Sequence, residues 1–540
     1  MSDDTTQAEQ TVGELLVAAL KECGARVGFG IPGVHSLAMY EAFRQQEGLS
    51  CVTARSEQGA GYMAEGYARA SGTPGLLLTI GGPGAANALT PVADAYADSV
   101  PLLHFSSEIP RDYLGTRRGY LHAMRDQLGV FRAAIGKAHC LADPQQAAQQ
   151  VVTAWEESVG PPPGPVYVEV PLDVLEQRTA PQEIRPPRPS PVTREVQGPL
   201  DAAADLLKSA RRPLLYVGGG ANNPEASAAL LRLAEGLQAP VLTTTKGKGA
   251  IPDDHPLHLG CSWAAEVRKS DWLKEADVVL AVGTRLSRRT HDLFGNLPLP
   301  ANLIHLDADP EMIGMNYPTR VGLVGSAAAG LDALLPERSA SRDTAERVRA
   351  FRDEARQAAR RRAPRMLALL ETLAAAIGPE AISMHDLNTV SVWSGSYLPV
   401  FKPRHFLFPM EFGVLGLSLP GAIGAKLARP EKPVVAFCGD GSFLFSCQEL
   451  ATAVQLSLQI VILVFNDNSY GSVARFQKRR YGAEYGTALH NPDFVALARS
   501  FGAQGVRCDD LARLPTLVQR ALETEGPTLV EVPIGTDWAG

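Results

Sequence analysis

The sequence predicts an α/β protein built from three doubly wound parallel sheets. Short apolar runs of strand length alternate with helical patterns along the chain, which is typical of parallel sheets covered by helices on both faces. In such folds ligands bind beyond the carboxyl ends of the strands, so functional residues are expected there. The clearest runs are residues 76–80, 102–105, 214–217, 278–282, 303–306, 434–437 and 460–465.

A repeated signature near the ends of the first and last thirds supports two copies of one architecture. Residues 164–171 and 526–533 are identical at six of eight positions, including the flanking Gly-Pro and Val-Pro pairs. Each segment is expected to be a buried strand that ends a domain. We therefore expect the two outer domains to be structural siblings.

Two interruptions divide the chain, whose 540 residues suit two to four domains. Proline clusters at 161–163 and 181–191 bracket a stretch that predicts an extended linker. A second boundary is expected between Leu335 and Pro364, where Glu337-Arg338-Ser339 leads into a charged run typical of a solvent-exposed connecting helix. The expected domains are residues 1–185, 195–340 and 365–540.

Composition excludes several classes of protein. Fifty-one basic and 58 acidic residues give a net charge of −7, the wrong sign for a broad nucleic-acid-binding face. No apolar run approaches the roughly 18–20 residues of a membrane span. The polar, acidic residues 1–7 do not resemble a signal peptide, so a cytoplasmic location is expected. Seven scattered cysteines without a C-x-x-C pair predict neither a disulfide framework nor a zinc site.

The most informative segment is a predicted strand–helix–strand unit in the last third. The strand at 433–438 ends in the polar turn Gly439-Asp440-Gly441-Ser442, a helical pattern covers 446–456, and a second strand ends before Asp467. A right-handed crossover brings both strand ends to one edge of the sheet, so Asp440 and Asp467 are expected side by side. Paired carboxylates and glycine-freed backbone amides suit Mg²⁺ and a diphosphate, whereas a lone Gly-Asp-Gly is usually only a turn.

This segment resembles the thiamine diphosphate motif of the acetolactate synthase and 2-oxo acid decarboxylase superfamily, which includes benzoylformate decarboxylase-like enzymes. Gly439-Asp440-Gly441 is followed after 24 residues by Asn466-Asp467-Asn468. The resemblance implies that Asp440, Asp467 and the carbonyl of Ser469 hold Mg²⁺, although Asp467 stands where the family usually has Asn. By the same resemblance we expect the cofactor to contact Gly441, Ser442, Asn468 and Tyr470.

The segment 55–69 is similar to a second motif of that family, in which a glutamate contacts N1′ of the aminopyrimidine. The glutamate corresponds to Glu57, which the resemblance makes the catalytic residue that activates the cofactor. From the residues alone, Glu57 would be a first-turn carboxylate favoured by the helix dipole. Gly413 and Leu415 match the motif that holds the cofactor in its bent shape. Asn388 and Thr389 stand where the family binds diphosphate, but they depart from its usual Gly-Gln-His.

The expected substrate pocket departs from the acetolactate synthases. Leu121-His122 occupies the place of their Phe-Gln pair, and Phe476 stands where some synthases have Trp. His122 is a candidate to donate protons, which would favour simple decarboxylation, or to orient a carboxylate; a lone histidine is more often structural. Val34 and Phe476 are the expected pocket residues.

The middle third resembles the family's central domain, which binds FAD in acetolactate synthases. Its glycine triplet, 218–220, is weak evidence for any dinucleotide, and the run common beside the flavin is absent, so FAD is not favoured. The resemblance names the outer domains pyrimidine-binding and diphosphate-binding. It also implies a homodimer or homotetramer, because the cofactor lies between the first domain of one subunit and the last domain of another.

The leading hypothesis is a thiamine diphosphate- and Mg²⁺-dependent enzyme that decarboxylates a small-molecule 2-oxo acid and transfers the acyl carbanion to a carbonyl acceptor. The alternatives are simple non-oxidative decarboxylation of an aromatic or basic 2-oxo acid to an aldehyde, and a non-catalytic thiamine diphosphate binder. A nucleotide-dependent oxidoreductase is disfavoured because no G-x-G-x-x-G with a following acidic residue occurs.

Overall fold

The computed structural model describes residues 9–188, 195–287, 297–336 and 343–538. The chain separates into two compact units, each described by itself. The first comprises residues up to 188 with 411–431 and 446–458, and the second comprises the rest. Residues 1–7, the last prolines of the expected linker (Pro189 and Pro191) and Glu337–Ser339 lie outside the described residues. No helix in the described ranges has the length and apolar character needed to span a membrane.

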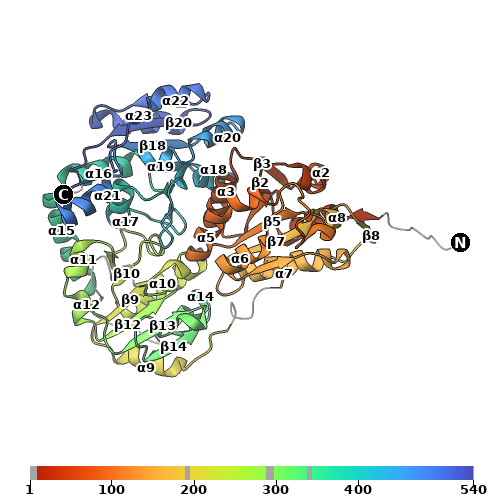
Figure 1. The fold of residues 1–540 in the computed structure, drawn as a ribbon. Helices are drawn as coiled ribbons and strands as arrows, with labels where there is room; N and C mark the ends of the chain where they lie inside the picture. The colour runs from red at the N-terminus through yellow and green to blue at the C-terminus, as the bar shows by residue number, and fades with distance from the viewer. Residues whose placement is uncertain (1–8, 189–194, 288–296, 337–342, 539–540) are drawn as a thin grey trace. The chain divides into compact units, whose positions relative to one another are not determined.

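The first unit is built on six parallel strands in the order β3-β2-β4-β5-β7-β6 (Figure 1). A separate antiparallel pair joins β1 (Gln10–Thr11) to β8 (Arg178–Thr179). The six strands are β2 (Val27–Gly30), β3 (Ser50–Thr53), β4 (Gly75–Thr79), β5 (Leu102–Glu108), β6 (Ala138–Cys140) and β7 (Pro165–Pro171).

Helices cover both faces of this sheet because successive strand residues point to opposite sides. In β4, Leu76 and Leu78 pack in the core cluster of α1, α2 and α7, while the methyl carbon of Leu77 lies near Gly61 of α3 on the other face. The helices are α1 (Val12–Cys23), α2 (Leu37–Gln45), α3 (Glu57–Ser71), α4 (Pro83–Asn87), α5 (Leu89–Asp98), α6 (Gln127–Ile135), α7 (Ala147–Val159), α8 (Leu172–Leu175), α18 (Ser418–Ala428) and α20 (Leu450–Gln455).

Helices α3 and α18, distant in sequence, lie side by side in the first unit (Figure 1). Glycines allow this approach: a Cβ on Gly66 would overlap the carbonyl oxygen of Gly421, and one on Gly424 would overlap that of Met63. The backbones therefore touch where side chains would otherwise separate them. This contact places the segment 411–431 with the first sheet.

The second unit contains the central sheet, whose order β11-β10-β9-β12-β13-β14 is the 3-2-1-4-5-6 order of dinucleotide-binding folds. Its strands are β9 (Pro213–Val217), β10 (Val241–Thr243), β11 (His258–Cys261), β12 (Val278–Val282), β13 (Leu303–Asp307) and β14 (Val321–Val324). Its helices are α9 (Leu200–Ser209), α10 (Pro224–Leu237), α11 (Ala265–Lys269), α12 (Trp272–Glu275) and α14 (Ala327–Ala333).

The last sheet, also in the second unit, has the order β16-β15-β17-β18-β20-β19. Its strands are β15 (Ile382–His385), β16 (Phe406–Leu407), β17 (Val434–Gly439), β18 (Val461–Asn466), β19 (Gln504–Arg507) and β20 (Thr528–Pro533). Its helices are α15 (Thr344–Arg362), α16 (Pro364–Ile377), α17 (Thr389–Tyr397), α19 (Asp440–Phe443), α21 (Gly471–Tyr481), α22 (Phe494–Ser500) and α23 (Leu514–Glu523).

The first and last sheets have the same connectivity. Numbered within each domain, both follow the order second, first, third, fourth, sixth, fifth. The repeated signature forms β7 in one sheet and β20 in the other, at equivalent fifth positions. The expectation of sibling outer domains is confirmed, as is the α/β class with three parallel sheets.

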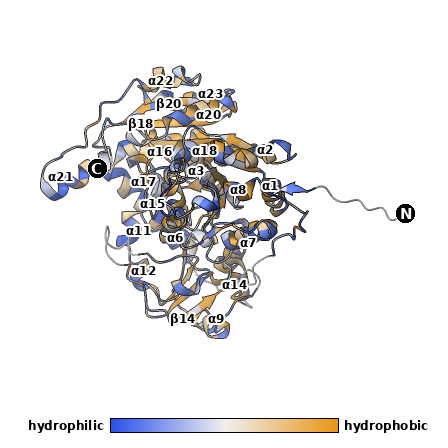
Figure 2. Cartoon of the chain, turned by 45° about the vertical axis from the view of Figure 1, so that its right-hand side comes forward, coloured by the Kyte–Doolittle hydropathy of each residue, from blue (hydrophilic) through white to orange (hydrophobic). Residues whose placement is uncertain are grey.

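All seven expected strands are present as parallel strands, and Figure 2 shows β18 and β20 in the orange of hydrophobic residues. Two local expectations were wrong. The stretch bracketed by prolines is not all linker: besides the expected strand, β7, it contains α8 and β8, and its longest described part without helix or strand is residues 180–188. The helix expected at 446–456 is shorter, because a 3₁₀ turn, η7 (Cys447–Glu449), precedes α20.

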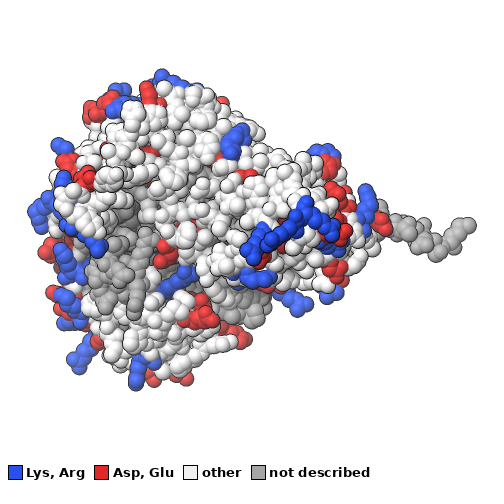
Figure 3. Space-filling model, viewed as in Figure 1, with Lys and Arg blue, Asp and Glu red and all other residues white. Residues whose placement is uncertain are grey.

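Surface features agree with the composition. The charged run after the second boundary is α15, in which only Thr344, Val348 and Ala359 are buried. On the face shown in Figure 3, acidic and basic side chains are interspersed over the described residues without a broad basic surface. No disulfide joins the seven cysteines, all of which lie in the described ranges. The expected domain bounds stay predictions.

Candidate functional site

Asp440 and Asp467 follow neighbouring strands of the last sheet. Strands β17 and β18 pair in parallel with Gly439 opposite Phe465, so both polar segments leave the same edge of the sheet. Asp440 does not lie in a simple turn, as expected from the sequence, but begins the one-turn helix α19. The negative charge of Asp440 is felt at Asp467, as expected for carboxylates that face one point.

Asn491, which sequence reasoning missed, ties the two strand ends together. Its Nδ2 donates to Asp440 Oδ2 at 2.7 Å, Asn466 Oδ1 at 3.0 Å and Asn468 Oδ1 at 3.3 Å. Its own Oδ1 is buried and accepts no hydrogen bond from the described residues. Asn491 lies in the loop before α22, and nothing in its sequence context distinguishes it from a turn asparagine.

The loop after β18 presents a further oxygen. Tyr470 N donates to Thr487 O at 2.8 Å and Leu489 N donates to Asn468 O at 2.8 Å, so the two chain segments run together. Asn468 adopts a positive φ of 51°. Between these bonds the carbonyl of Ser469 receives no hydrogen bond from the described part of the chain.

The oxygen atoms at this edge fit Mg²⁺. Burial and the charge of Asp440 raise the pKa of Asp467 to about 6, and burial also raises the pKa of Asp440. A divalent cation would offset this repulsion and use the unpaired oxygens of Ser469 and Asn491, which are the hard ligands it prefers. No group of three or more His, Cys, Asp or Glu side chains suited to a metal occurs in the described residues. The expected site uses only two carboxylates, so this finding does not conflict with it.

Two of the residues expected to bind the diphosphate, Asn388 and Ser442, have side chains that bond to Asp386. Asn388 and Ser442 are engaged by the fully buried Asp386, whose Oδ1 accepts from Asn388 Nδ2 at 2.8 Å and whose Oδ2 accepts from Ser442 Oγ at 2.7 Å. Burial raises the pKa of Asp386 to about 6. Asn388 also caps α17, accepting from Ser391 N at 2.8 Å. Its side chain therefore shapes the backbone around Thr389.

Gly441 and Thr389 are buried beside Tyr470 and Arg475, respectively. A Cβ on Gly441 would come within 2.7 Å of the Tyr470 ring, so only glycine fits beside that ring. Thr389 Oγ1 accepts from Arg475 Nη2 at 2.9 Å, and Arg475 Nη1 is buried without a hydrogen-bond partner among the described residues. Sequence reasoning passed over Arg475, although it directly precedes Phe476.

Glu57 begins α3 in the first unit. Ser56 caps the helix, its Oγ accepting from Gly59 N at 2.9 Å. Glu57 Oε2 accepts from Asn87 Nδ2 at 3.1 Å, and a Cβ on Gly84 would lie 3.4 Å from Oε1. The carboxylate is thus held at one oxygen by the amide of Asn87, and the glycine loop 81–84 leaves room beside the other.

His122 lies against the same glycine loop and pairs with a second histidine. A Cβ on Gly82 would overlap the carbonyl oxygen of His122, which has a positive φ of 68°. The ring of His122 meets that of His35 edge-to-face at 5.3 Å. Burial and the charge of His122 lower the pKa of His35. His35 Nδ1 is buried and has no hydrogen-bond partner among the described residues. Sequence reasoning named the adjacent Val34 but missed His35.

The remaining expected site residues are Gly413, Leu415, Val34 and Phe476, and their binding roles stay predictions. Leu415 O accepts a long bond of 3.5 Å from Tyr62 OH, within the first unit, and Gly413 has a positive φ of 77°. Val34 is 59% exposed in the first unit, and Phe476 is 55% exposed in the second. Neither side chain packs in a core, which fits residues that line a pocket.

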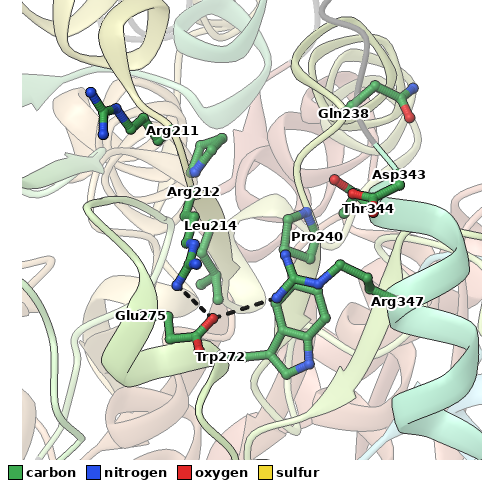
Figure 4. A pocket seen from close by; sticks show the side chains of 11 residues that line it. Arg211, Arg212, Leu214, Gln238, Pro240, Trp272, Glu275, Asp343, Thr344 and Arg347 are labelled. Carbon is green, nitrogen blue, oxygen red and sulfur yellow. Dashed lines mark hydrogen bonds and ion pairs between the residues drawn. The ribbon is translucent and has the colours of Figure 1, made fainter.

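A pocket of about 420 Å³ lies elsewhere, at the amino ends of β9 and β10 in the central sheet (Figure 4). Two of its three arginines are already paired: Glu275 bridges Arg212 at 2.8 Å and Arg347 at 3.4 Å, and Arg347 stacks 4.6 Å over Trp272. Ligands of parallel sheets bind at the opposite edge. We assign no ligand to this pocket.

The glycine triplet of the central sheet has a packing role. A Cβ on Gly220 would come within 2.8 Å of Gly283 Cα, and one on Gly218 would overlap the Gly283 carbonyl. The loops after β9 and β12 therefore touch through glycines. These glycines need no dinucleotide to explain them.

Comparison with known proteins identifies the family of the three domains. Models of the thiamine pyrophosphate (thiamine diphosphate) enzyme family match the chain three times: the N-terminal TPP binding domain at residues 10–130, the central domain at 200–334 and the C-terminal TPP binding domain at 386–532.

Curated relatives match nearly the whole chain. A protein of Pseudomonas aeruginosa named "Probable 2-ketoarginine decarboxylase" is 37% identical over 97% of this chain and 94% of its own. The acetolactate synthase large subunit of Corynebacterium glutamicum is 31% identical over 98% of this chain and 87% of its own. A probable acetolactate synthase large subunit of Methanocaldococcus jannaschii is 31% identical over 96% and 91%. The chain belongs to the thiamine diphosphate-dependent enzyme family that contains the acetolactate synthases and 2-oxo acid decarboxylases.

Proposed function

We propose that this enzyme uses thiamine diphosphate and Mg²⁺ to decarboxylate a 2-oxo acid and release the corresponding aldehyde. The observation that carries the proposal is the pairing of His35 with His122 beside the glycine loop that contacts Glu57. The carbanion left by loss of CO₂ becomes an aldehyde only if a proton reaches it. An imidazole pair beside the catalytic glutamate is suited to deliver that proton.

The second unit carries the residues that would hold the metal and the diphosphate, and the first unit carries Leu415. Asp440, Asp467 and the Ser469 carbonyl would bind Mg²⁺, and the glycine-lined edge around Gly441 would receive the diphosphate. Leu415 would support the bent cofactor. When bound, thiamine diphosphate supplies the electron sink that stabilises the carbanion.

Two side chains of the first unit move protons. Asn87 donates a hydrogen bond to Glu57 Oε2, so Oε1 is the oxygen that Glu57 would present to the aminopyrimidine of a bound cofactor. Burial and the charge of His122 lower the pKa of His35, which disfavours the charged form of that ring. His122 is then the imidazole that presents a proton toward the substrate, and His35 supports it.

The first substrate to test is 2-ketoarginine, because the relative with 37% identity carries that name. Purified protein would be incubated with 2-ketoarginine, an aliphatic and an aromatic 2-oxo acid, each with thiamine diphosphate and Mg²⁺. The proposal predicts CO₂ and an aldehyde in equal amounts from one of them. Release of CO₂ without aldehyde, with all carbon in a ligated product, would contradict it.

Ligation to a second carbonyl is the other candidate function, since relatives of 31% identity are named acetolactate synthases. The same incubations with an added aldehyde or 2-oxo acid acceptor separate the two outcomes. A hydroxyketo product formed faster than free aldehyde would favour ligation.

We also infer a homodimer or homotetramer in which Glu57 of one subunit faces Asp440 of another. Large apolar side chains are exposed in the first unit, among them Val34 at 59% and Leu121 at 62%, beside the two histidines. Exposed apolar groups that cluster are typical of contact surfaces. Light scattering would find at least a dimer, and a monomer with full activity would contradict this inference.

A further inference from the structure

Glu449 is a fully buried carboxylate that the proposed chemistry does not use. It ends the 3₁₀ turn η7 and has no exposed surface, although a buried charge is costly unless it is hydrogen-bonded. Both Glu449 and α3 belong to the first unit. The hydrogen-bond partners of its two carboxylate oxygens therefore indicate its role.

Its carboxylate accepts hydrogen bonds from the two residues that precede Glu57. Arg55 N donates to both oxygens at 3.1 Å, Ser56 N donates to Oε1 at 3.0 Å, and Ser56 Oγ lies 3.2 Å from Oε1. Thr452 Oγ1 donates to Oε2 at 2.7 Å. Every partner is a donor, so the arrangement suits an ionised carboxylate, and these bonds oppose the burial that raises its pKa.

These contacts fix the point where α3 begins. Ser56 is the N-cap, with φ −150° and ψ 151°, and the next residue, Glu57, is the first of the helix. A negative charge at a helix N-terminus is favoured by the helix dipole. Because Glu449 binds the amides of the two residues before the helix, it holds the backbone from which the Glu57 side chain projects.

The carboxylate of Glu449 is tightly packed. A Cβ on Gly59 would overlap Glu449 Oε1, so glycine is needed one turn into α3 for the carboxylate to reach the amides. Thr452 holds the other oxygen from the same helical segment as Glu449 itself. The carboxylate can therefore take only one position relative to the start of α3.

We propose that Glu449 is a positioning residue that holds Glu57 in register with the cofactor. The inference rests on the proposed role of Glu57 in activating thiamine diphosphate. Without the carboxylate, the helix start relaxes and the Glu57 oxygen no longer meets the aminopyrimidine in the reactive geometry. Cofactor activation slows, while cofactor binding through the metal and diphosphate persists.

The test compares Glu449→Gln with a matched control, Gln455→Ala. The glutamine is nearly isosteric but turns an amide nitrogen toward donors. Gln455 joins the same two segments, accepting from the Arg55 guanidinium at 2.6 Å, but this bond is to a side chain and not to the backbone before Glu57. For each protein, exchange of the C2 proton of bound thiamine diphosphate with deuterium is followed by acid quench and NMR. Cofactor affinity and thermal unfolding are measured alongside.

We expect Glu449→Gln to slow the exchange at least tenfold, while the cofactor dissociation constant changes less than threefold and kcat falls without a rise in KM. Gln455→Ala should exchange at the wild-type rate. Exchange by Glu449→Gln at the wild-type rate would overturn the positioning role. Absence of cofactor binding or exchange in the wild-type protein would instead overturn the proposed function.

Thr452→Val covers the case in which Glu449→Gln does not fold. It removes only the hydroxyl that holds Oε2 and keeps the side-chain shape, so folding should survive. The expected exchange is two- to fivefold slower than in the wild type. A wild-type exchange rate in folded Thr452→Val would overturn the proposal.

Discussion

Two glutamates occupy equivalent positions of the repeated signature, but their surroundings differ. In the last sheet, Glu531 accepts from Arg507 Nη1 at 2.6 Å and from Asn466 Nδ2 at 2.8 Å. In the first sheet, Glu169 is 5% exposed, forms no salt bridge within the described ranges and feels the charge of Glu108. Burial first, and then Glu108, raise the pKa of Glu169 to about 7.

The raised pKa sets both the sign and the size of an effect on stability. An acid whose pKa rises on folding stabilises the folded state below its ordinary pKa, and this stabilisation is lost as pH rises through the folded value. Here the loss spans the range from the ordinary 4.5 to about 7. Since a difference of one in pKa corresponds to about 1.4 kcal/mol, the free energy of unfolding should fall by roughly 2–3 kcal/mol between pH 5 and pH 8.

Glu169→Gln removes this dependence. We expect the variant to gain roughly 2–3 kcal/mol over the wild type at pH 8 relative to pH 5, which corresponds to about 5 °C in the transition of a domain of this size. Thermal unfolding at both pH values measures the gain. Glu531→Gln is the matched control and should instead lose stability at pH 8, because Arg507 loses its buried partner and keeps only the exposed Asp509. If the difference in stability between Glu169→Gln and the wild type is the same at pH 5 and pH 8, the reasoning is refuted.

Three further changes test separate parts of the structure. His122→Ala should slow aldehyde release about 10²–10⁴-fold and leave cofactor affinity unchanged; equal rates in a product assay would argue against proton donation. Asp467→Asn should still bind Mg²⁺ and thiamine diphosphate, because an amide oxygen also ligates Mg²⁺; equilibrium dialysis would show complete loss if the metal assignment is wrong. Gly424→Ala should lower stability by about 1–3 kcal/mol, because its Cβ would overlap the Met63 carbonyl in the α3–α18 contact; an unchanged melting temperature would contradict that packing.

Much of the fold could be predicted because the strands of parallel sheets are continuous apolar runs. The run at 278–282 is β12 residue for residue, and the repeated signature located equivalent strands in two sheets. Such signals are local, so one sequence suffices. The membership of 411–431 in the first unit was not predictable, because it depends on glycine contacts between α3 and α18 that no local pattern records.

The strand ends that precede Asp440 and Asp467 could be predicted, because an apolar run and a polar motif meet there. The roles of Asp440 and Glu57 stay predictions. Four residues were missed, Asn491, His35, Arg475 and Glu449, because their importance comes from partners far away in sequence. Asn388 was named from the sequence as a diphosphate-binding residue. In the structure its side chain donates to Asp386 and accepts from Ser391 N at the start of α17. Residue type and spacing do not reveal such competition for hydrogen bonds.

The most direct test of the central claim is the release of CO₂ from 2-ketoarginine and other 2-oxo acids by the purified protein. We predict that release requires both thiamine diphosphate and Mg²⁺, stops on chelation of the metal, and is abolished in Glu57→Gln, which still folds. CO₂ release without added cofactor from protein shown to contain none, or full activity of Glu57→Gln, would contradict the account.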